Sequence, residues 1–483
     1  MVFSASTFPL ILLFGLTLGC EPAQAIQEAS AWSRFRGPAG LGHGQARDLP
    51  AEFSAEQNCS FQVSVPAGHS SPVLSRDSIF LTGERDQELW TLALSREDGH
   101  LLWEQKAPRT QVTKVDQRNH AASPTPALND QVVVVFFPDY GLLCYDHQGV
   151  EQWRVPLGPF RNVYGMGASP ILHEQQVLLA CDQNKGSFLA SFSLKDGSEN
   201  WRTLRPYARS GHCTPLLWVN QAGRTEVILP GSFYLDAYDV DSGLRQWWVK
   251  GLSFEMKSVP AIQDGVLYIN GFGSPMNNPG NQVQVPDFPA TLASADGNQD
   301  GKIGRAEMPA GRAANWFDFV DLDVDGHLDA EEWQYLSDAL GSLNGLLAIR
   351  LGGEGDCTES NLSWAYRRSI PQMPSPLAIG DHLFVLSDSG GLLTTFSPTT
   401  GELIRRDRIP GAIGNFYAAP VVADGKIFLA SLEGLVVVLP DDGSFTPLAV
   451  NDLGEPIYAT PAPDGQEIYV RTGFHLFCFS VKG

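Results

Sequence analysis

Positively charged residues are scarce in this chain. Its 483 residues include 33 Lys and Arg against 54 Asp and Glu, which gives a formal net charge of −21. Proteins that bind the phosphate backbone of nucleic acids need a basic surface. We therefore expect no nucleic-acid partner.

Cysteine is also sparse, and no two cysteines have CxxC spacing. The seven are Cys20, Cys59, Cys144, Cys181, Cys213, Cys357 and Cys478. This spacing disfavours zinc ribbons and thioredoxin-type redox sites. The sequence also lacks a Ser-His-Asp grouping and a Gly-rich phosphate loop, so it indicates neither of those enzyme classes.

The apolar run at the N-terminus, Phe8 to Leu18, is too short for a stable membrane span and is typical of an export signal. Two processing sites remain open. Cleavage after Ala23-Gln24-Ala25 would make residues 1–25 a signal peptide. Alternatively, Gly19-Cys20 ends a lipoprotein signal and Cys20 carries a lipid, the one membrane contact expected. Either predicts the periplasm or cell envelope.

One acidic twelve-residue pattern occurs twice, 25 positions apart: DGNQDGKIGRAE from Asp296 to Glu307, and DLDVDGHLDAEE from Asp321 to Glu332. Each copy has oxygen-bearing side chains at positions 1, 3 and 5, Gly at 6, an aliphatic residue at 8 and Glu at 12. Calcium takes about six to eight oxygen ligands, so the chain must wrap around it. The pattern is that of the EF-hand calcium loop.

The spacing assigns a ligand set to each loop. The first set is Asp296, Asn298, Asp300, the backbone carbonyl of Lys302, and Glu307. The second set is Asp321, Asp323, Asp325, the backbone carbonyl of His327, and Glu332. Asp329, at position 9, would act through a water. Ile303 and Leu328, at position 8, should align the two loops.

The second loop has five carboxylates at ligand positions (Asp321, Asp323, Asp325, Asp329 and Glu332) against three in the first, so we expect it to bind calcium more tightly. Exported EF-hand modules meet abundant calcium and bind it at about 10⁻⁴–10⁻³ M. A constant structural clamp is therefore favoured over a calcium sensor. Ca²⁺ is the only cofactor that the sequence predicts.

Self-similarity along the chain predicts a repeat architecture. A small residue and Pro, followed by an apolar strand, recur at Pro72, Pro126, Pro170, Pro215, Pro260, Pro376, Pro420 and Pro461. The spacing is near 45, apart from one interval of 116 that contains the EF-hand pattern. A second marker, Gly-x-x-x-Trp, recurs at Gly99–Trp103, Gly149–Trp153, Gly197–Trp201 and Gly243–Trp247. Four-stranded units of about this length form β-propeller blades.

The sequence therefore predicts an all-β, eight-bladed β-propeller, with a small α-helical EF-hand pair inserted in blade five. The expected parts after the signal are a lead-in segment at 26–53, blades one to five at 54–274, the EF-hand pair at 275–345 and blades five to eight at 346–483. The last unit has room for three strands, so Ser60–Val65 should supply its fourth. This would make Cys59 and Cys478 neighbours, and a disulfide between them is one hypothesis.

Several segments resemble the exported bacterial proteins with pyrroloquinoline-quinone-type (PQQ-type) β-propeller repeats. They include WSRFRGPAGLG at Trp32–Gly42, GHSSP at Gly68–Pro72, LLAIRLGGEGD at Leu346–Asp356, WAYRRSIPQMPSP at Trp364–Pro376, NFYAAPVVADGKIFLASLEG at Asn415–Gly434 and PIYATPAPDGQEIYVRTGFHLF at Pro456–Phe477. The family name describes the shape of the blades and does not imply a bound quinone.

Blade topology places the insertion on the face that holds the channel mouth. The residue three before each marker proline should line that mouth: His69, Ser123, Gly167, His212, Lys257, Met373, Tyr417 and Tyr458. Neighbouring crossings would add Arg118, Arg161, Tyr164, Arg209 and Glu255. Such a ring could bind an anionic or sugar-like ligand. The alternative is an ordinary polar channel rim.

Two functions are consistent with these features. The first is a calcium-binding, non-catalytic binding or scaffold protein of the cell envelope, similar to the propeller lipoproteins that assist outer-membrane assembly. Its partner would be another envelope protein or a small polar ligand at the channel mouth. The alternative is a PQQ-dependent alcohol or sugar dehydrogenase. The resemblance implies a stacking Trp and, in many alcohol-oxidising members, a pair of adjacent cysteines. No two cysteines here are adjacent, and the blade turns account for the Trp residues. No catalytic or quinone-binding residue is assigned.

Overall fold

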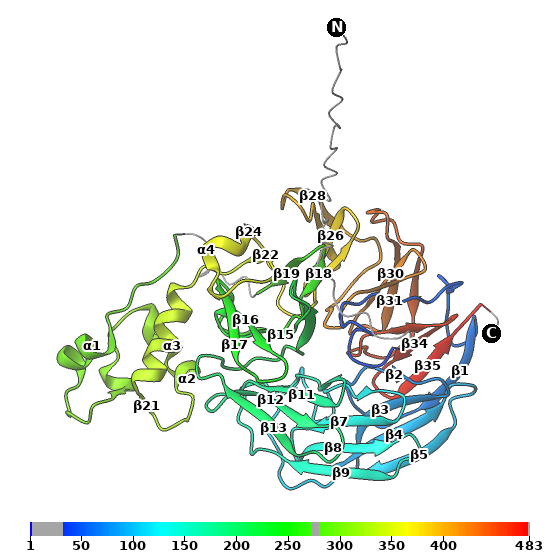
Figure 1. Ribbon diagram of the computed structural model, residues 1–483, viewed down its shortest axis with the longest axis horizontal. Helices are drawn as coiled ribbons and strands as arrows, with labels where there is room; N and C mark the ends of the chain where they lie inside the picture. The colour runs from blue at the N-terminus through cyan, green and yellow to red at the C-terminus, as the bar shows by residue number, and fades with distance from the viewer. Residues whose placement is uncertain (2–31, 272–279, 482–483) are drawn as a thin grey trace.

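Eight β-sheets surround a central axis in the computed structural model, which confirms the eight-bladed propeller (Figure 1). The structure describes Met1 and residues 32–271 and 280–481. The predicted export signal and Cys20 lie outside these residues. Among the helices of the described residues, none has both the length and the apolar character needed to cross a bilayer.

Each of the first four blades is an antiparallel sheet whose strands follow the chain order outward from the axis. Blade one has β2 (Val73–Leu74), β3 (Ser78–Arg85), β4 (Glu88–Ser95) and β5 (Leu101–Lys106). Blade two has β6 (Ala127–Leu128), β7 (Val132–Phe137), β8 (Gly141–Asp146) and β9 (Glu151–Pro156). Blade three has β10 (Ile171–His173), β11 (Gln176–Cys181), β12 (Phe188–Ser193) and β13 (Glu199–Leu204). Blade four has β14 (Leu216–Val219), β15 (Thr225–Pro230), β16 (Tyr234–Asp239) and β17 (Arg245–Lys250), and β23 (Gly355–Asp356) pairs with β17 in parallel.

The remaining blades follow the same plan, with an excursion in blade five. Blade five has β18 (Ala261–Gln263), β19 (Val266–Asn270), β22 (Leu346–Arg350) and β24 (Leu362–Tyr366), the last preceded by the short helix α4 (Thr358–Asn361). Blade six has β25 (Leu377–Ile379), β26 (His382–Leu386), β27 (Leu392–Phe396) and β28 (Leu403–Arg408). Blade seven has β29 (Val421–Ala423), β30 (Lys426–Ala430), β31 (Leu435–Pro440) and β32 (Ala449–Asp452). Blade eight has β33 (Ala462–Asp464), β34 (Glu467–Arg471), β35 (His475–Phe479) and β1 (Cys59–Ser64).

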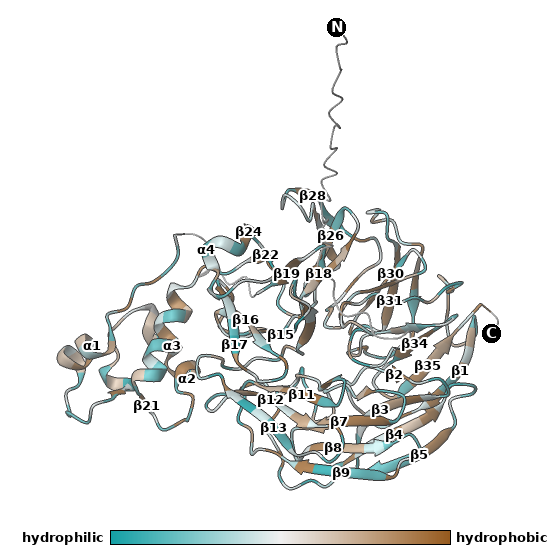
Figure 2. Ribbon diagram, in the orientation of Figure 1, coloured by the Kyte–Doolittle hydropathy of each residue, from teal (hydrophilic) through white to brown (hydrophobic). Residues whose placement is uncertain are grey.

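Hydropathy differs between the middle and outer strands of a blade (Figure 2). The middle strand β7 has the sequence VVVVFF and is almost entirely buried, because its two faces pack against neighbouring blades. The outer strand β28 has the sequence LIRRDR and is exposed along its whole length. The middle strands of the blades are therefore buried, and the polar outer strands face solvent.

Tryptophan and glycine form a repeated contact between successive blades. The Trp103 indole donates to the carbonyl of His147 at 2.9 Å and covers Gly149 of blade two. A Cβ at Gly149 would lie 2.6 Å from the indole, and the φ of this residue is +85°, so glycine is required on both grounds. Trp153 covers Gly197 and Trp201 covers Gly243 in the same way. These tryptophans pack between successive blades.

A second inter-blade contact is a ring of hydroxyl groups around the axis. The residue before the marker proline is Ser or Thr in six blades, and each hydroxyl accepts from the equivalent backbone N–H of the preceding blade at 2.9–3.1 Å. The acceptors are Ser71, Thr125, Ser169, Thr214, Ser375 and Thr460. Val259 and Ala419 occupy the other two positions and have no hydroxyl to offer. All six hydroxyl residues are buried.

The ring closes where β1 pairs with β35, so the first strand of the described chain completes the last blade, as predicted. Cys59 lies opposite Phe479, and Cys478 lies opposite Phe61. The two cysteines are neighbours, but both are free thiols. The disulfide hypothesis is therefore wrong: adjacency on paired strands does not by itself give the Cβ–Cβ approach that a disulfide needs.

The lead-in segment from Trp32 onward bridges the inner strands of several blades. The carbonyls of Trp32 and Ser33 accept from Leu74 in blade one and Leu128 in blade two. The Arg36 guanidinium is fully buried and donates to four carbonyls, those of Leu41, Val259, Pro260 and Pro376. Burial lowers the pKa of Arg36 to about 9. The WSRFRGPAGLG motif is thus a connector at the propeller axis.

We predict that Thr125→Val destabilises the propeller by about 1–3 kcal/mol. The substitution keeps the shape of the side chain but leaves the buried N–H of Ser71 without its acceptor. Urea-induced unfolding measures the loss. Thr399→Val, in an exposed turn between β27 and β28, is the matched control and should change stability by less than about 0.5 kcal/mol. Equal effects of the two substitutions would contradict a stabilising role for the hydroxyl ring.

Candidate calcium site

Residues 280–345 form a helical module beside the ring of blades (Figure 1). Its elements are α1 (Phe288–Ala295), β20 (Ile303–Gly304), η2 (Arg305–Glu307), η3 (Arg312–Trp316), α2 (Phe317–Val320), β21 (His327–Leu328) and α3 (Ala330–Gly341). Trp333, Leu336 and Leu340 recur at helical spacing, so they share one face of α3, and that face forms part of the module's core. Pro286 and Pro289 precede or begin α1, which limits the first hand to a short entering helix.

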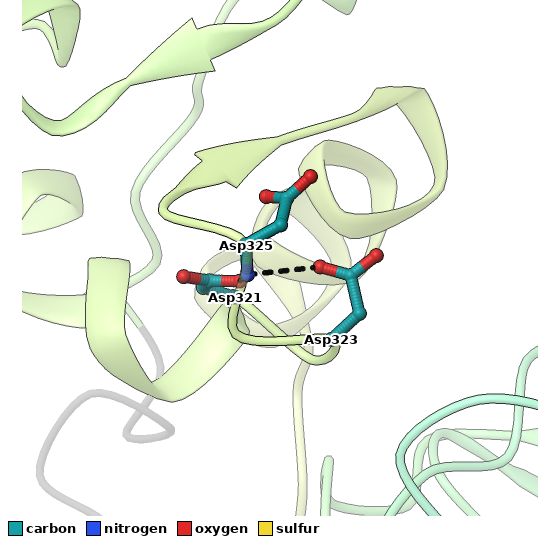
Figure 3. A group of neighbouring side chains, drawn as sticks. All are labelled: Asp321, Asp323 and Asp325. Carbon is teal, nitrogen blue, oxygen red and sulfur yellow. Dashed lines mark hydrogen bonds between the residues drawn. The ribbon is translucent and has the colours of Figure 1, made fainter.

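The second acidic loop wraps its own backbone around the carboxylate at position 1. Asp321 accepts from the N–H of Asp325 at 3.1 Å and from that of Gly326 at 3.0 Å. Asp325 also donates its N–H to Asp323 at 3.3 Å (Figure 3). Gly326 has a φ of +83°, the left-handed turn for which the pattern requires glycine.

Glu332, at position 12, ties the end of this loop to its beginning. Its carboxylate accepts from the N–H groups of Leu322 at 2.8 Å, Asp323 at 3.3 Å and Asp329 at 3.1 Å. The side chain is only 1% exposed, and this burial raises the pKa of Glu332. Asp329 caps α3 by accepting from the N–H of Glu332, so the two acidic residues form a capping box.

The first loop has the same framework with a weaker donor set. Asp296 accepts from Asp300 and Gly301, and Glu307 accepts from Gly297 at 2.9 Å. Position 3 is Asn298, whose amide donates to Asp300 at 2.9 Å. The amide brings no negative charge, so this loop has fewer anionic oxygens for a cation.

The two loops are joined at position 8 and at position 7. Ile303 pairs with Leu328 in the short ladder between β20 and β21, as predicted, and both are fully buried. The position 7 side chains reach across: the Lys302 ammonium contacts Asp325 of the second loop, and His327 lies 3.8 Å from Asp300 of the first. Each loop therefore places a side chain beside the other's position 5 carboxylate.

The donor set of the second loop fits calcium. Carboxylate oxygens of Asp321, Asp323 and Asp325 lie within 4.8 Å of one another, as do oxygens of Asp323, Asp329 and Glu332. Converging hard oxygen donors of this kind are what Ca²⁺ prefers. The structure brings together all four acidic ligands predicted for this loop, and Asp323 belongs to a group with each of the other three.

The module docks on the propeller through apolar and charged contacts. Phe254, in the crossing between blades four and five, makes edge contacts with Trp316 and Phe319, at centroid distances of 5.2 and 5.3 Å. Phe233 packs similarly on Tyr335, and the Arg209 guanidinium pairs with Glu331. The contacting propeller residues lie in inter-blade crossings and in the loop between β15 and β16, and Figure 1 shows the module at the side of the ring.

The residues that were predicted to line the channel mouth lie together around one cavity. All eight residues predicted to line the mouth do line one cavity of about 170 Å³: His69, Ser123, Gly167, His212, Lys257, Met373, Tyr417 and Tyr458. Of the five additional candidates, Arg118 and Tyr164 line it too. Arg161, Arg209 and Glu255 do not: the two arginines turn toward the EF-hand module and Glu255 pairs with Lys257.

The charges of this cavity are already balanced. Lys257 pairs with Glu255 at 2.8 Å, and Arg118 pairs with Asp116 at 2.6 Å. Burial lowers the pKa of His69 and of His212 to about 3, so both imidazoles are neutral at pH 7. The ring therefore offers an anion little net positive charge. A volume of 170 Å³ also lies below the roughly 300–1,000 Å³ of pockets for larger ligands.

Comparisons with known proteins agree with both parts of the structure. Residues 56–271 match the family model of the outer membrane protein assembly factor BamB, and residues 313–336 match that of the EF hand. Over blades one to five the chain is similar to the PQQ-type β-propeller repeat proteins, and its insertion contains a segment similar to an EF hand. The EF-hand match covers the second loop and not the first.

Individual relatives match different shares of this chain. BamB of Alkalilimnicola ehrlichii is 29% identical over 211 residues, which are 42% of this chain and 50% of that protein. This chain thus spans about half the length of that curated relative. The structure of BamB from Moraxella catarrhalis has a TM-score of 0.51 at 12% identity and covers 86% of this chain and 99% of its own. A europium-containing methanol dehydrogenase has a TM-score of 0.53 at 9% identity, covering 93% and 98%. These two likenesses show the fold alone.

We predict that Asp321→Ala lowers calcium affinity more than Asp296→Ala, by at least about tenfold. Asp321 belongs to the loop with five carboxylates and also holds its turn through Asp325 and Gly326. Isothermal titration calorimetry of the two variants and the unaltered protein measures the order. The reverse order would contradict the assignment of the tighter site to the second loop.

Proposed function

We propose that this protein is a calcium-binding, non-catalytic binding or scaffold protein of the bacterial cell envelope. The second acidic loop carries the proposal, because its carboxylates converge within a segment that matches the EF-hand family model. The calcium ligands would be Asp296, Asn298, Asp300, the Lys302 carbonyl and Glu307 in the first loop, and Asp321, Asp323, Asp325, the His327 carbonyl and Glu332 in the second.

Calcium would act as a structural clamp in this proposal. Without calcium, the acidic side chains of the two loops repel one another at close range, and the ammonium groups of Lys185 and Lys302 offset this repulsion only in part. A bound ion would offset that repulsion and hold the loops in the geometry that α3 and the β20–β21 ladder share. The apolar contacts of Phe254 with Trp316 and Phe319 would then carry this rigidity to the propeller.

A protein partner in the envelope is supported by the propeller itself. BamB relatives are, by name, outer membrane protein assembly factors, and 29% identity over 211 residues links this chain to one of them. The cavity at the channel mouth is small and charge-balanced. We therefore propose that the propeller faces and the module, rather than a deep ligand pocket, provide the binding surface.

We expect chelation of calcium to make residues 280–345 more sensitive to protease while the blades remain resistant. The physical reason is the repulsion among the loop carboxylates, which Lys185 and Lys302 offset only in part. Limited proteolysis with and without EGTA, followed by mass mapping of the cuts, measures this. Glu307→Gln/Glu332→Gln should show the sensitive pattern even in calcium. A module that is equally resistant in both conditions would contradict the clamp.

We expect no saturable binding of pyrroloquinoline quinone in the presence of calcium. The cavity is small, and its lining within the described chain includes tyrosine and histidine but no tryptophan on which a quinone could stack. Tryptophan quenching reports binding, and dye reduction with simple alcohols and sugars reports turnover. Saturable quenching together with turnover would replace the scaffold proposal with a quinone-dependent dehydrogenase.

A further inference from the structure

A lysine of the propeller reaches into the second acidic loop. Lys185 lies between β11 and β12 of blade three. Its ammonium nitrogen, Nζ, lies 2.7 Å from Asp323 Oδ2, 3.0 Å from Asp329 Oδ2 and 3.2 Å from Glu332 Oε1. Three carboxylates of one EF-hand loop therefore bind a cation that belongs to another part of the same chain.

These three carboxylates overlap with the proposed calcium ligands. They occupy positions 3, 9 and 12 of the loop, and their oxygens lie within 4.8 Å of one another. Positions 3 and 12 are direct ligand positions in the pattern, and position 9 acts through water. The Lys185 ammonium and a calcium ion would therefore both need the carboxylates of Asp323 and Glu332.

The backbone around Lys185 is held in place, so this contact is built into the interface. The Asn184 side chain donates to the carbonyl of Leu322 at 3.0 Å, and Arg209 donates to the carbonyl of Asn184 at 2.8 Å. Gln183 and Ser187 bond to each other across the turn. Among the described residues, no propeller lysine or arginine pairs with an acidic side chain of the first loop.

We propose that Lys185 regulates the second calcium site by competing with the ion for Asp323 and Glu332. The inference rests on the proposed calcium function and deepens it. Calcium entry displaces the ammonium, so the site binds more weakly than its five carboxylates would otherwise allow. By reciprocity, a filled second loop weakens the contact between the module and the turn of blade three. The apolar contacts of Phe254 keep the module docked in either state.

Calcium titrations of the whole mature protein test this competition. Every protein carries Glu307→Gln to silence the first loop, so calorimetry reports the second loop alone. We expect Lys185→Met to bind calcium at least about tenfold more tightly, because it removes a positive charge about 3 Å from two ligands. Lys185→Arg, which keeps the charge, should stay within about threefold of the parent. Lys195→Met, an exposed lysine of the same blade, is the matched charge control and should not change affinity.

Hydrogen exchange gives a second readout that does not depend on affinity. Calcium should speed amide exchange at Asn184, whose N–H donates to the Arg161 carbonyl at 2.7 Å, in the parent protein and should have no such effect in Lys185→Met. Equal affinities of the parent and Lys185→Met, or weaker binding by the variant, would overturn the competition while leaving calcium binding intact. An absence of binding in every protein would overturn the proposed calcium function as well.

Discussion

Closure of the ring is the constraint on which the rest of the structure depends. Eight sheets meet at one axis, where the backbone N–H groups before the inner strands are buried and need acceptors. A hydroxyl from the next blade satisfies six of them, from Ser71 round to Thr460. The Trp–Gly contacts, Arg36 and the β1–β35 pairing add further links between blades or to the axis. The propeller so closed is the platform against which the EF-hand module packs.

Much of this could be predicted from spacing, because a repeat of fixed length fixes what lies at equivalent places. The marker prolines predicted eight residues at the channel mouth, from His69 to Tyr458, and all eight line the cavity. The twelve-residue loop pattern likewise fixed the pairing of Ile303 with Leu328. The closing strand followed from the missing fourth strand of blade eight. In each of these cases the path of the backbone alone determines where the residue or strand lies.

Contacts that depend on the direction in which a long side chain extends could not be predicted from the repeat spacing. Arg161 and Arg209 lie near the ring in sequence, yet both turn to the module. Lys185 lies 138 residues before its partner Asp323, and nothing in the periodicity relates them. The hydroxyl ring did leave a signal, since Ser or Thr precedes six of the eight marker prolines. That signal could have been found by asking which buried N–H groups needed an acceptor.

The central claim is that the second acidic loop is a calcium site whose ligands are shared with a propeller lysine. A crystal structure of the mature protein grown in calcium, with anomalous data, tests it most directly. The account predicts an anomalous peak among Asp321, Asp323, Asp325 and Glu332, with the Lys185 ammonium beyond hydrogen-bond distance of Asp323. A loop without a peak at saturating calcium, and with Lys185 still bound to Asp323 and Glu332, would contradict it.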